Sequence, residues 1–162
     1  KETGGLFLSV GREIAGKYKE IEFNDMIVDA TCMRMVTNPE MFDVVVTTNL
    51  FGDILSDLAA GLIGGLGLTP GANIGKQASM FEAVHGTAPD IAGKGLANPT
   101  ALMLAAAMML DHIEMPDEAS TMRTAIFNVL GRGEVLTGDL GGEANTTQYT
   151  DALIREIDTL KG

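Results

Sequence analysis

Apolar side chains recur every fourth position near the start of the chain, which predicts an amphipathic helix over residues 6–18. Leu6, Val10, Ile14 and Tyr18 form one stripe along this helix. The Asn98-Pro99 pair predicts another helix start, because Asn supplies a capping oxygen and Pro is tolerated at the first helical position. In all, the patterns predict helices over residues 6–18, 30–36, 49–60, 99 to about 110, about 117–130 and about 147–160.

Short apolar segments between these helices predict strands. Residues 42–48 are β-branched and apolar in succession, which is typical of a strand covered on both faces of an α/β sheet. Residues 21–29 and 79–84 are also predicted to be strands. Glycine and proline make residues 61–75 and 85–97 long loops. The alternation of helices and strands predicts an α/β fold, in which ligands collect in loops at strand ends.

Composition limits the possible functions. The chain has 162 residues, of which 46% are hydrophobic and 20% charged, a globular profile. Its 22 acidic and 11 basic residues give a net charge of −11, so we expect neither nucleic acid nor membrane as a partner. Cys32 is the sole cysteine, which excludes an intrachain disulfide and favours a reducing compartment. The chain begins at Lys1 within a helical pattern, so we expect a piece of a longer protein.

Three aspartates are candidate metal ligands. Asp53 and Asp57 lie four positions apart and therefore on one face of a predicted helix. Asp29, at the end of a predicted strand, is a possible third ligand. Carboxylate oxygens favour Mg²⁺ or Mn²⁺. The alternative is structural: Asp53 interacts with a helix N-terminus, and Asp57 is an ordinary surface residue.

The two loops do not match standard nucleotide-binding motifs. Residues 61–75 contain no G-x-G-x-x-G, and Gly75-Lys76 is followed by Gln77 instead of the Ser or Thr of a P-loop. In residues 85–93 the candidate binding residue is Asp90, since a carboxylate can accept hydrogen bonds from a ribose and would repel a 2′-phosphate. A capping or turn role for Asp90 is the alternative.

Three longer stretches together carry a family resemblance. They are Asn-Leu-Phe-Gly-Asp-Ile-Leu-Ser-Asp at 49–57, Thr-Pro-Gly-Ala-Asn-Ile at 69–74, and His-Gly-Thr-Ala-Pro-Asp-Ile-Ala-Gly at 85–93 followed by Ala-Asn-Pro at 97–99. They resemble the β-decarboxylating dehydrogenases, the family of isocitrate and 3-isopropylmalate dehydrogenases. The resemblance implies the non-Rossmann, two-domain α/β fold of that family, present as a C-terminal fragment. Residues 1–63 would belong to the small, dimer-forming domain and residues 64–162 to the large cofactor-binding domain.

The resemblance also assigns the candidate sites. Asp29 of one protomer, together with Asp53 and Asp57 of its partner, would hold Mg²⁺ or Mn²⁺ in a dimer or higher oligomer. NAD is the implied cofactor, because NADP-dependent members have a basic residue and an aromatic where this chain has Asp90 and Ile91. The implied cofactor contacts are His85, Gly86, Thr87, Ala88, Asp90, Ile91 and Asn98. The family's catalytic Lys and Tyr would lie upstream of Lys1, so the fragment alone is expected to be inactive and not to fold normally.

The implied reaction is metal-dependent oxidative decarboxylation of a small 2-hydroxy acid. Residues 47–74 resemble NAD-dependent isocitrate dehydrogenases more than isopropylmalate enzymes, which favours isocitrate and 2-oxoglutarate as substrate and product. The alternatives are another family substrate (3-isopropylmalate, homoisocitrate, or a tartrate or malate type), a non-catalytic regulatory subunit, or a generic acidic Mg²⁺-binding module. We expect a cytoplasmic location, or the mitochondrial matrix if the protein is eukaryotic.

Overall fold

The computed structural model describes residues 2–162, which form two compact units, one up to Leu55 and one from Ser56 to Gly162. Helix α3 (Asn49–Leu62) contains the boundary between the units. This division rests on contacts within the chain. The assignment of residues 1–63 to a dimer-forming domain stays a prediction.

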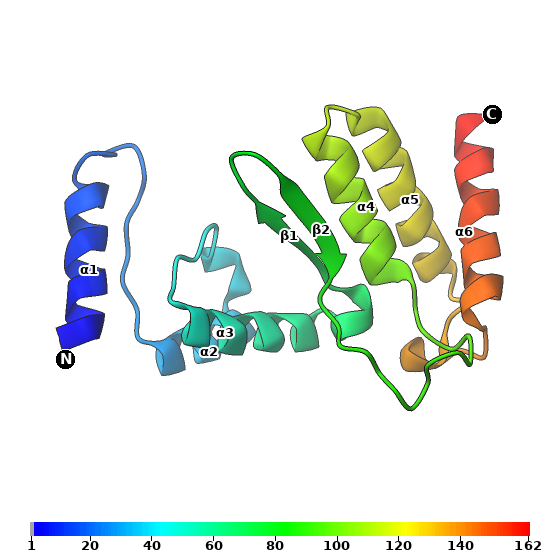
Figure 1. Cartoon of the computed structure of the whole chain (residues 1–162), viewed down its shortest axis with the longest axis horizontal. Helices are drawn as coiled ribbons and strands as arrows, with labels where there is room; N and C mark the ends of the chain where they lie inside the picture. Colours follow the sequence, from blue (N-terminus) through cyan, green and yellow to red (C-terminus); the bar gives the residue numbers. More distant parts are fainter. Residues whose placement is uncertain (1) are drawn as a thin grey trace. The chain divides into compact units, whose positions relative to one another are not determined.

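The first unit contains helices α1 (Glu2–Ala15) and α2 (Val28–Thr37), the 3-10 turn η1 (Pro39–Met41) and the start of α3 (Figure 1). The predicted helices at 6–18, 30–36 and 49–60 are therefore confirmed, with shifted ends. Helix α2 stops before Asn38-Pro39, as expected, because the residue before proline disfavours helical backbone angles.

The two strands predicted in this unit are wrong. Residues 21–27 and 42–48 contain no strand, and α2 already begins at Val28. Asp29 therefore lies in the first turn of a helix instead of at a strand end. The apolar side chains of these segments are not buried: Val44 is 80% exposed and Val46 77% exposed. A strand needs a hydrogen-bonded neighbour, and neither segment has one among residues 2–162.

The second unit begins with an antiparallel hairpin of β1 (Pro70–Ile74) and β2 (Ser79–Ala83), in which Pro70 pairs with Ala83 and Ile74 with Ser79. Strand β2 confirms the prediction for 79–84, whereas β1 lies inside the predicted loop 61–75. The many glycines of residues 61–75, together with Pro70, predicted a loop here. A glycine fits at position 71 because a Cβ there would lie 2.9 Å from Val84 Cγ2.

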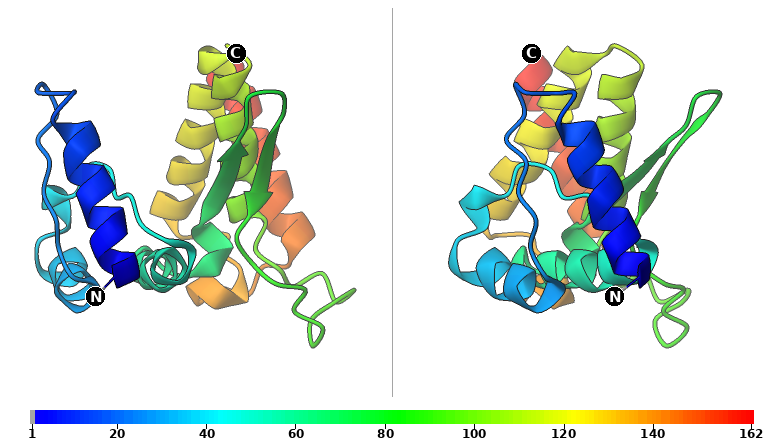
Figure 2. Two further views of the ribbon diagram at one scale, coloured as in Figure 1. Left: turned by 60° about the vertical axis from the view of Figure 1, so that its left-hand side comes forward. Right: turned by 90° about the vertical axis from the view of Figure 1, so that its left-hand side faces the viewer.

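Three helices form the core of the second unit: α4 (Thr100–His112), α5 (Pro116–Arg132) and α6 (Thr146–Lys161). The hairpin and α5 both pack against α4, and α6 packs against α5. Figure 2 shows these helices side by side, with the hairpin tip extending away from them in its right-hand view. The core contains Ile126, Val129, Tyr149 and Leu153, with Met103 and Leu104 packed against it.

Polar contacts also join α5 to α6. Arg132 and Asn128 both donate hydrogen bonds to the Glu156 carboxylate. The hydrogen bond from Arg132 is the main reason that the pKa of Glu156 lies below its usual value. No helix within residues 2–162 is long and apolar enough to cross a membrane.

The start of α6 is fixed by a capping box, and its loss should loosen the first turn. Asn145 accepts a hydrogen bond from the Gln148 amide at 2.8 Å, and the Gln148 side chain accepts one from the Asn145 amide at 2.9 Å. We expect Asn145→Ala to destabilise the helix start by about 1 kcal/mol. Hydrogen exchange of the first α6 amides should become about fivefold faster. Asn145→Ser should preserve most of the protection; equal protection in all three proteins would contradict a capping role.

Candidate functional site

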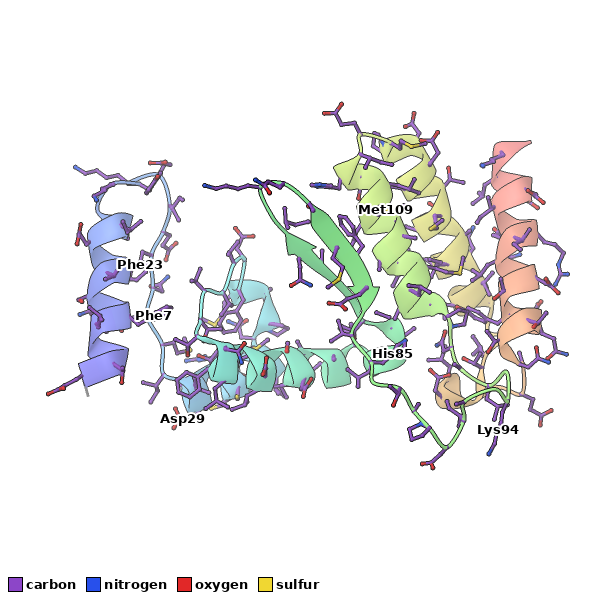
Figure 3. The ribbon with its side chains drawn as sticks, viewed as in Figure 1. Phe7, Phe23, Asp29, His85, Lys94 and Met109 are labelled. Carbon is purple, nitrogen blue, oxygen red and sulfur yellow. The ribbon has the colours of Figure 1, made fainter. Side chains whose placement is uncertain are left out.

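The loop of residues 85–97 connects β2 to α4, and all of its residues are exposed. Three successive turns shape its middle, with hydrogen bonds from Ile91 N to Ala88 O, from Ala92 N to Pro89 O and from Lys94 N to Ile91 O. Figure 3 labels His85 near the beginning of the loop and Lys94 toward its end. The loop therefore presents its side chains and backbone amides to solvent, where a ligand can reach them.

Ala88 has an uncommon backbone conformation. Its φ is +42°, in the left-handed region that costs a non-glycine residue about 1–2 kcal/mol. The residue also precedes Pro89, which further restricts its backbone. Conformations of this kind occur preferentially at ligand-binding sites, so Ala88 supports a functional role for the loop.

The end of the loop is attached to the start of α6. Thr146 N donates to Gly95 O at 2.8 Å, and Thr146 Oγ1 donates to Ala97 O at 2.5 Å. The capped helix start thus holds the segment that leads into Asn98. In this way the exposed loop is connected to the helical core of the second unit.

Asn98 is buried, and its side chain makes three hydrogen bonds. Its Oδ1 accepts hydrogen bonds from Thr100 N at 3.0 Å and from Thr100 Oγ1 at 2.6 Å. Its Nδ2 donates to Asp139 Oδ2 at 2.9 Å. The prediction that Asn98 caps the helix and Pro99 begins it is wrong by one position: Pro99 occupies the cap position without a side-chain cap hydrogen bond, and α4 begins at Thr100. Asn98 lies one residue earlier and still accepts a hydrogen bond from the first helical amide, Thr100 N.

Asp139 is a neighbour of Asn98 that the sequence did not indicate. It lies in the short turn η3 (Gly138–Leu140), and its Oδ1 accepts a hydrogen bond from Thr137 Oγ1 at 2.5 Å. Gly67, in the turn η2 (Leu66–Leu68), packs against this pair: a Cβ there would lie 2.8 Å from Asp139 Oδ2. Three separate loops of the second unit therefore meet at the Asn98–Asp139 pair.

Tyr149 extends this arrangement into the core. Its ring is fully buried, and its hydroxyl lies 2.8 Å from Thr100 Oγ1. Burial raises the pKa of Tyr149, so the phenol keeps its proton near neutral pH. Tyr149, Thr100, Asn98 and Asp139 together form a continuous series of hydrogen bonds, which we call the polar chain.

The three candidate metal ligands are exposed aspartates. Asp29 lies in the first turn of α2 (Figure 3), where its Oδ1 accepts a hydrogen bond from Ala30 N at 2.7 Å. The positive end of the helix dipole favours a carboxylate at this position. Asp53 and Asp57 share helix α3, and Asn49 Nδ2 donates to Asp53 Oδ2 at 3.4 Å.

Residues 2–162 contain no group of three or more His, Cys, Asp or Glu side chains arranged to hold a metal ion. Asp53 and Asp57 lie one helical turn apart on α3, as the spacing predicted.

Comparison with known proteins identifies a family model that matches most of this chain. The model described as isocitrate/isopropylmalate dehydrogenase matches residues 2–153. A mitochondrial regulatory subunit of NAD isocitrate dehydrogenase from Dictyostelium discoideum is 52% identical, covering 97% of this chain and 45% of that protein. The mitochondrial catalytic subunit 5 of NAD isocitrate dehydrogenase from Arabidopsis thaliana is 53% identical, covering 94% of this chain and 41% of that protein.

A solved structure agrees with these relatives. The crystal structure of isocitrate dehydrogenase from Methylococcus capsulatus superposes with a TM-score of 0.89 at 59% identity, covering 94% of this chain and 46% of that one. The predicted α/β fold of the isocitrate/isopropylmalate dehydrogenase type is thereby confirmed. This chain spans less than half the length of the relatives that it matches.

Proposed function

We propose, from the premise that this chain belongs to the isocitrate/isopropylmalate dehydrogenase family, that the full-length protein oxidises and decarboxylates isocitrate to 2-oxoglutarate with reduction of NAD. The observation that carries the proposal is the identity of at least 52%, over nearly the whole chain, to subunits named for isocitrate and NAD. 3-Isopropylmalate and the other family acids remain the alternative substrates.

The exposed loop of residues 85–97 and Asn98 are proposed to bind NAD. The contacts are those implied by the resemblance: His85, Gly86, Thr87, Ala88, Asp90, Ile91 and Asn98. The exposed Asp90 carboxylate suits a ribose, because it accepts hydrogen bonds from hydroxyl groups and repels a phosphate. The strained backbone of Ala88 and the attachment of the loop end to Thr146 support a preformed binding loop.

Asp29, Asp53 and Asp57 are proposed to hold Mg²⁺ or Mn²⁺. The donor set fits, since all three carboxylates are exposed and such hard oxygen ligands suit these cations. When bound, the ion would supply electrostatic stabilisation of negative charge on the substrate oxygens. Following the resemblance to the family, we propose that Asp29 of one protomer completes the site on α3 of another.

A catalytic role is favoured over a regulatory one because this chain has an aspartate at all three proposed metal-ligand positions, 29, 53 and 57. The regulatory alternative has a specific basis, since one of the similar proteins is named a regulatory subunit. The names of these relatives as subunits also make a hetero-oligomer an alternative to the proposed homodimer. Both relatives are named mitochondrial, which supports the matrix for a eukaryotic protein and gives no support to the cytoplasmic prediction.

The test is an assay of the full-length protein with isocitrate or 3-isopropylmalate, each with NAD or NADP. We expect NADH to form from isocitrate and NAD, and to stop forming when EDTA removes the divalent ion. Preference for 3-isopropylmalate would overturn the substrate assignment. No turnover with any pair, followed by activation of a separate catalytic partner on mixing, would support the regulatory alternative.

A further inference from the structure

The polar chain has a definite direction. Asn98 Oδ1 accepts a hydrogen bond from the Thr100 amide, which identifies that atom as the oxygen of the side-chain amide. The single hydroxyl hydrogen of Thr100 therefore points to Asn98 Oδ1. Since Thr100 Oγ1 has no second hydrogen for Tyr149, the Tyr149 hydroxyl must be the donor in that 2.8 Å contact. Hydrogen bonds thus run from Tyr149 to Thr100, on to Asn98, and from Asn98 Nδ2 to Asp139.

The polar chain leads from the core to the surface. Tyr149 and Thr100 are fully buried, Asn98 is 9% exposed, and Asp139 is exposed. Buried hydrogen-bonding groups that satisfy one another hold a single arrangement, because any other leaves a polar atom unpaired. Thr100, itself bonded to Tyr149, therefore sets which way the Asn98 amide faces, and Asn98 and Thr137 together hold the Asp139 carboxylate.

We propose that Tyr149 and Thr100 are positioning residues for the dinucleotide: through the polar chain, they hold the Asn98 side chain in the orientation that the cofactor requires. This inference rests on the proposed function, in which Asn98 contacts NAD. Neither Tyr149 nor Thr100 needs to touch the ligand. A tyrosine hydroxyl has an ordinary pKa of about 10, and burial raises the pKa of Tyr149, so its hydroxyl is a donor at neutral pH.

The experiment is steady-state kinetics of the full-length protein with Tyr149→Phe, which removes only the hydroxyl. We expect KM for NAD to rise about three- to tenfold, the effect of one lost hydrogen bond. The kcat should change by less than about twofold and KM for the acid substrate should stay the same, because the polar chain acts on cofactor binding alone. Direct titration with NADH should show the same loss of affinity.

Two controls separate positioning from stability. Ile126→Val shortens a fully buried core residue beside Tyr149 and should lower the unfolding temperature without changing KM for NAD. Thr100→Val removes the hydroxyl and should raise KM for NAD. Thr100→Ser keeps a hydroxyl, so its KM for NAD should equal that of the wild type. If Tyr149→Phe does not fold, the comparison of Thr100→Val with Thr100→Ser tests the positioning role by itself.

A double variant separates the proposed contact of Asn98 with NAD from the positioning role of Tyr149 and Thr100. Asn98→Ala should raise KM for NAD by itself, and adding Tyr149→Phe to it should have no further effect. An unchanged KM in Asn98→Ala would overturn the proposed role of Asn98 in cofactor binding. Two results would overturn the positioning role alone. One is a double variant in which the increases in KM for NAD from Asn98→Ala and Tyr149→Phe multiply. The other is an unchanged KM for NAD in both Tyr149→Phe and Thr100→Val.

Discussion

Replacement of Asp53 by Asn in the full-length protein is expected to lower kcat/KM for isocitrate by more than about 100-fold at limiting Mg²⁺. Loss of a residue that only supports a metal ligand costs about 10–100-fold in metal affinity or activity, so loss of a proposed ligand should cost at least as much. The substitution keeps the size of the side chain and removes its charge. Much of the activity should return when Mg²⁺ or Mn²⁺ is raised, because the defect is one of metal affinity.

Activity as a function of metal concentration provides the measurement. Asp158→Asn, which neutralises an exposed aspartate on α6, serves as the matched control and should behave as wild type. Asp57→Asn should resemble Asp53→Asn, since both side chains lie on α3. Unchanged metal dependence in both α3 variants would contradict the proposed site and leave Asp53 and Asp57 with ordinary helix-surface roles.

The second large effect concerns the choice of cofactor. The double variant Asp90→Lys with Ile91→Tyr should increase the ratio of kcat/KM with NADP to kcat/KM with NAD by more than about tenfold. A lysine at position 90 attracts the 2′-phosphate that the native carboxylate repels. Both positions lie in the exposed loop, with Ile91 37% exposed, so the fold should tolerate the change.

Kinetics with both cofactors measures this ratio. Lys94→Ala, which changes a charged residue of the same loop outside the proposed contacts, provides a control and should leave the ratio within about twofold of wild type. An unchanged ratio in the double variant would contradict the role assigned to Asp90.

The helices of this chain could be predicted because their signals are local. Four-residue apolar spacing, the Asn98-Pro99 start and the stop at Asn38-Pro39 each act within one or two turns. All six predicted helices are present, and α5 and α6 differ from their predicted ranges by no more than two residues at either end.

The strands were less predictable because a strand depends on a partner distant in sequence. Residues 42–48 have a clear β-branched pattern, yet their valines are exposed and unpaired within residues 2–162. Strand β1 shows the opposite case: Pro70 and Gly71 suggested a loop, but pairing with β2 makes the segment a strand. A sequence pattern describes one segment, whereas the hydrogen bonds of a sheet depend on a second segment elsewhere in the chain.

Only those parts of the candidate site that lie within sequence motifs could be predicted. Asn98 and the exposed loop came from the motifs, but Asp139 and Tyr149 carry no local signal. They contact Asn98 and Thr100 across separations of 41 and 49 residues. The three aspartates illustrate the same limit, because residue types identify carboxylate ligands but do not say which of them lie close together in space.

The most direct test of the shared metal site is a mixed dimer of Asp29→Asn and Asp53→Asn chains, co-expressed with different tags and purified through both. If Asp29 completes the site of the neighbouring protomer, one of the two sites in this dimer is intact, and activity should be about half that of wild type. A mixed dimer of Asp53→Asn and Asp57→Asn chains has no intact site and should be inactive. A dimer of Asp29→Asn and Asp53→Asn chains no more active than its parents would contradict the shared site.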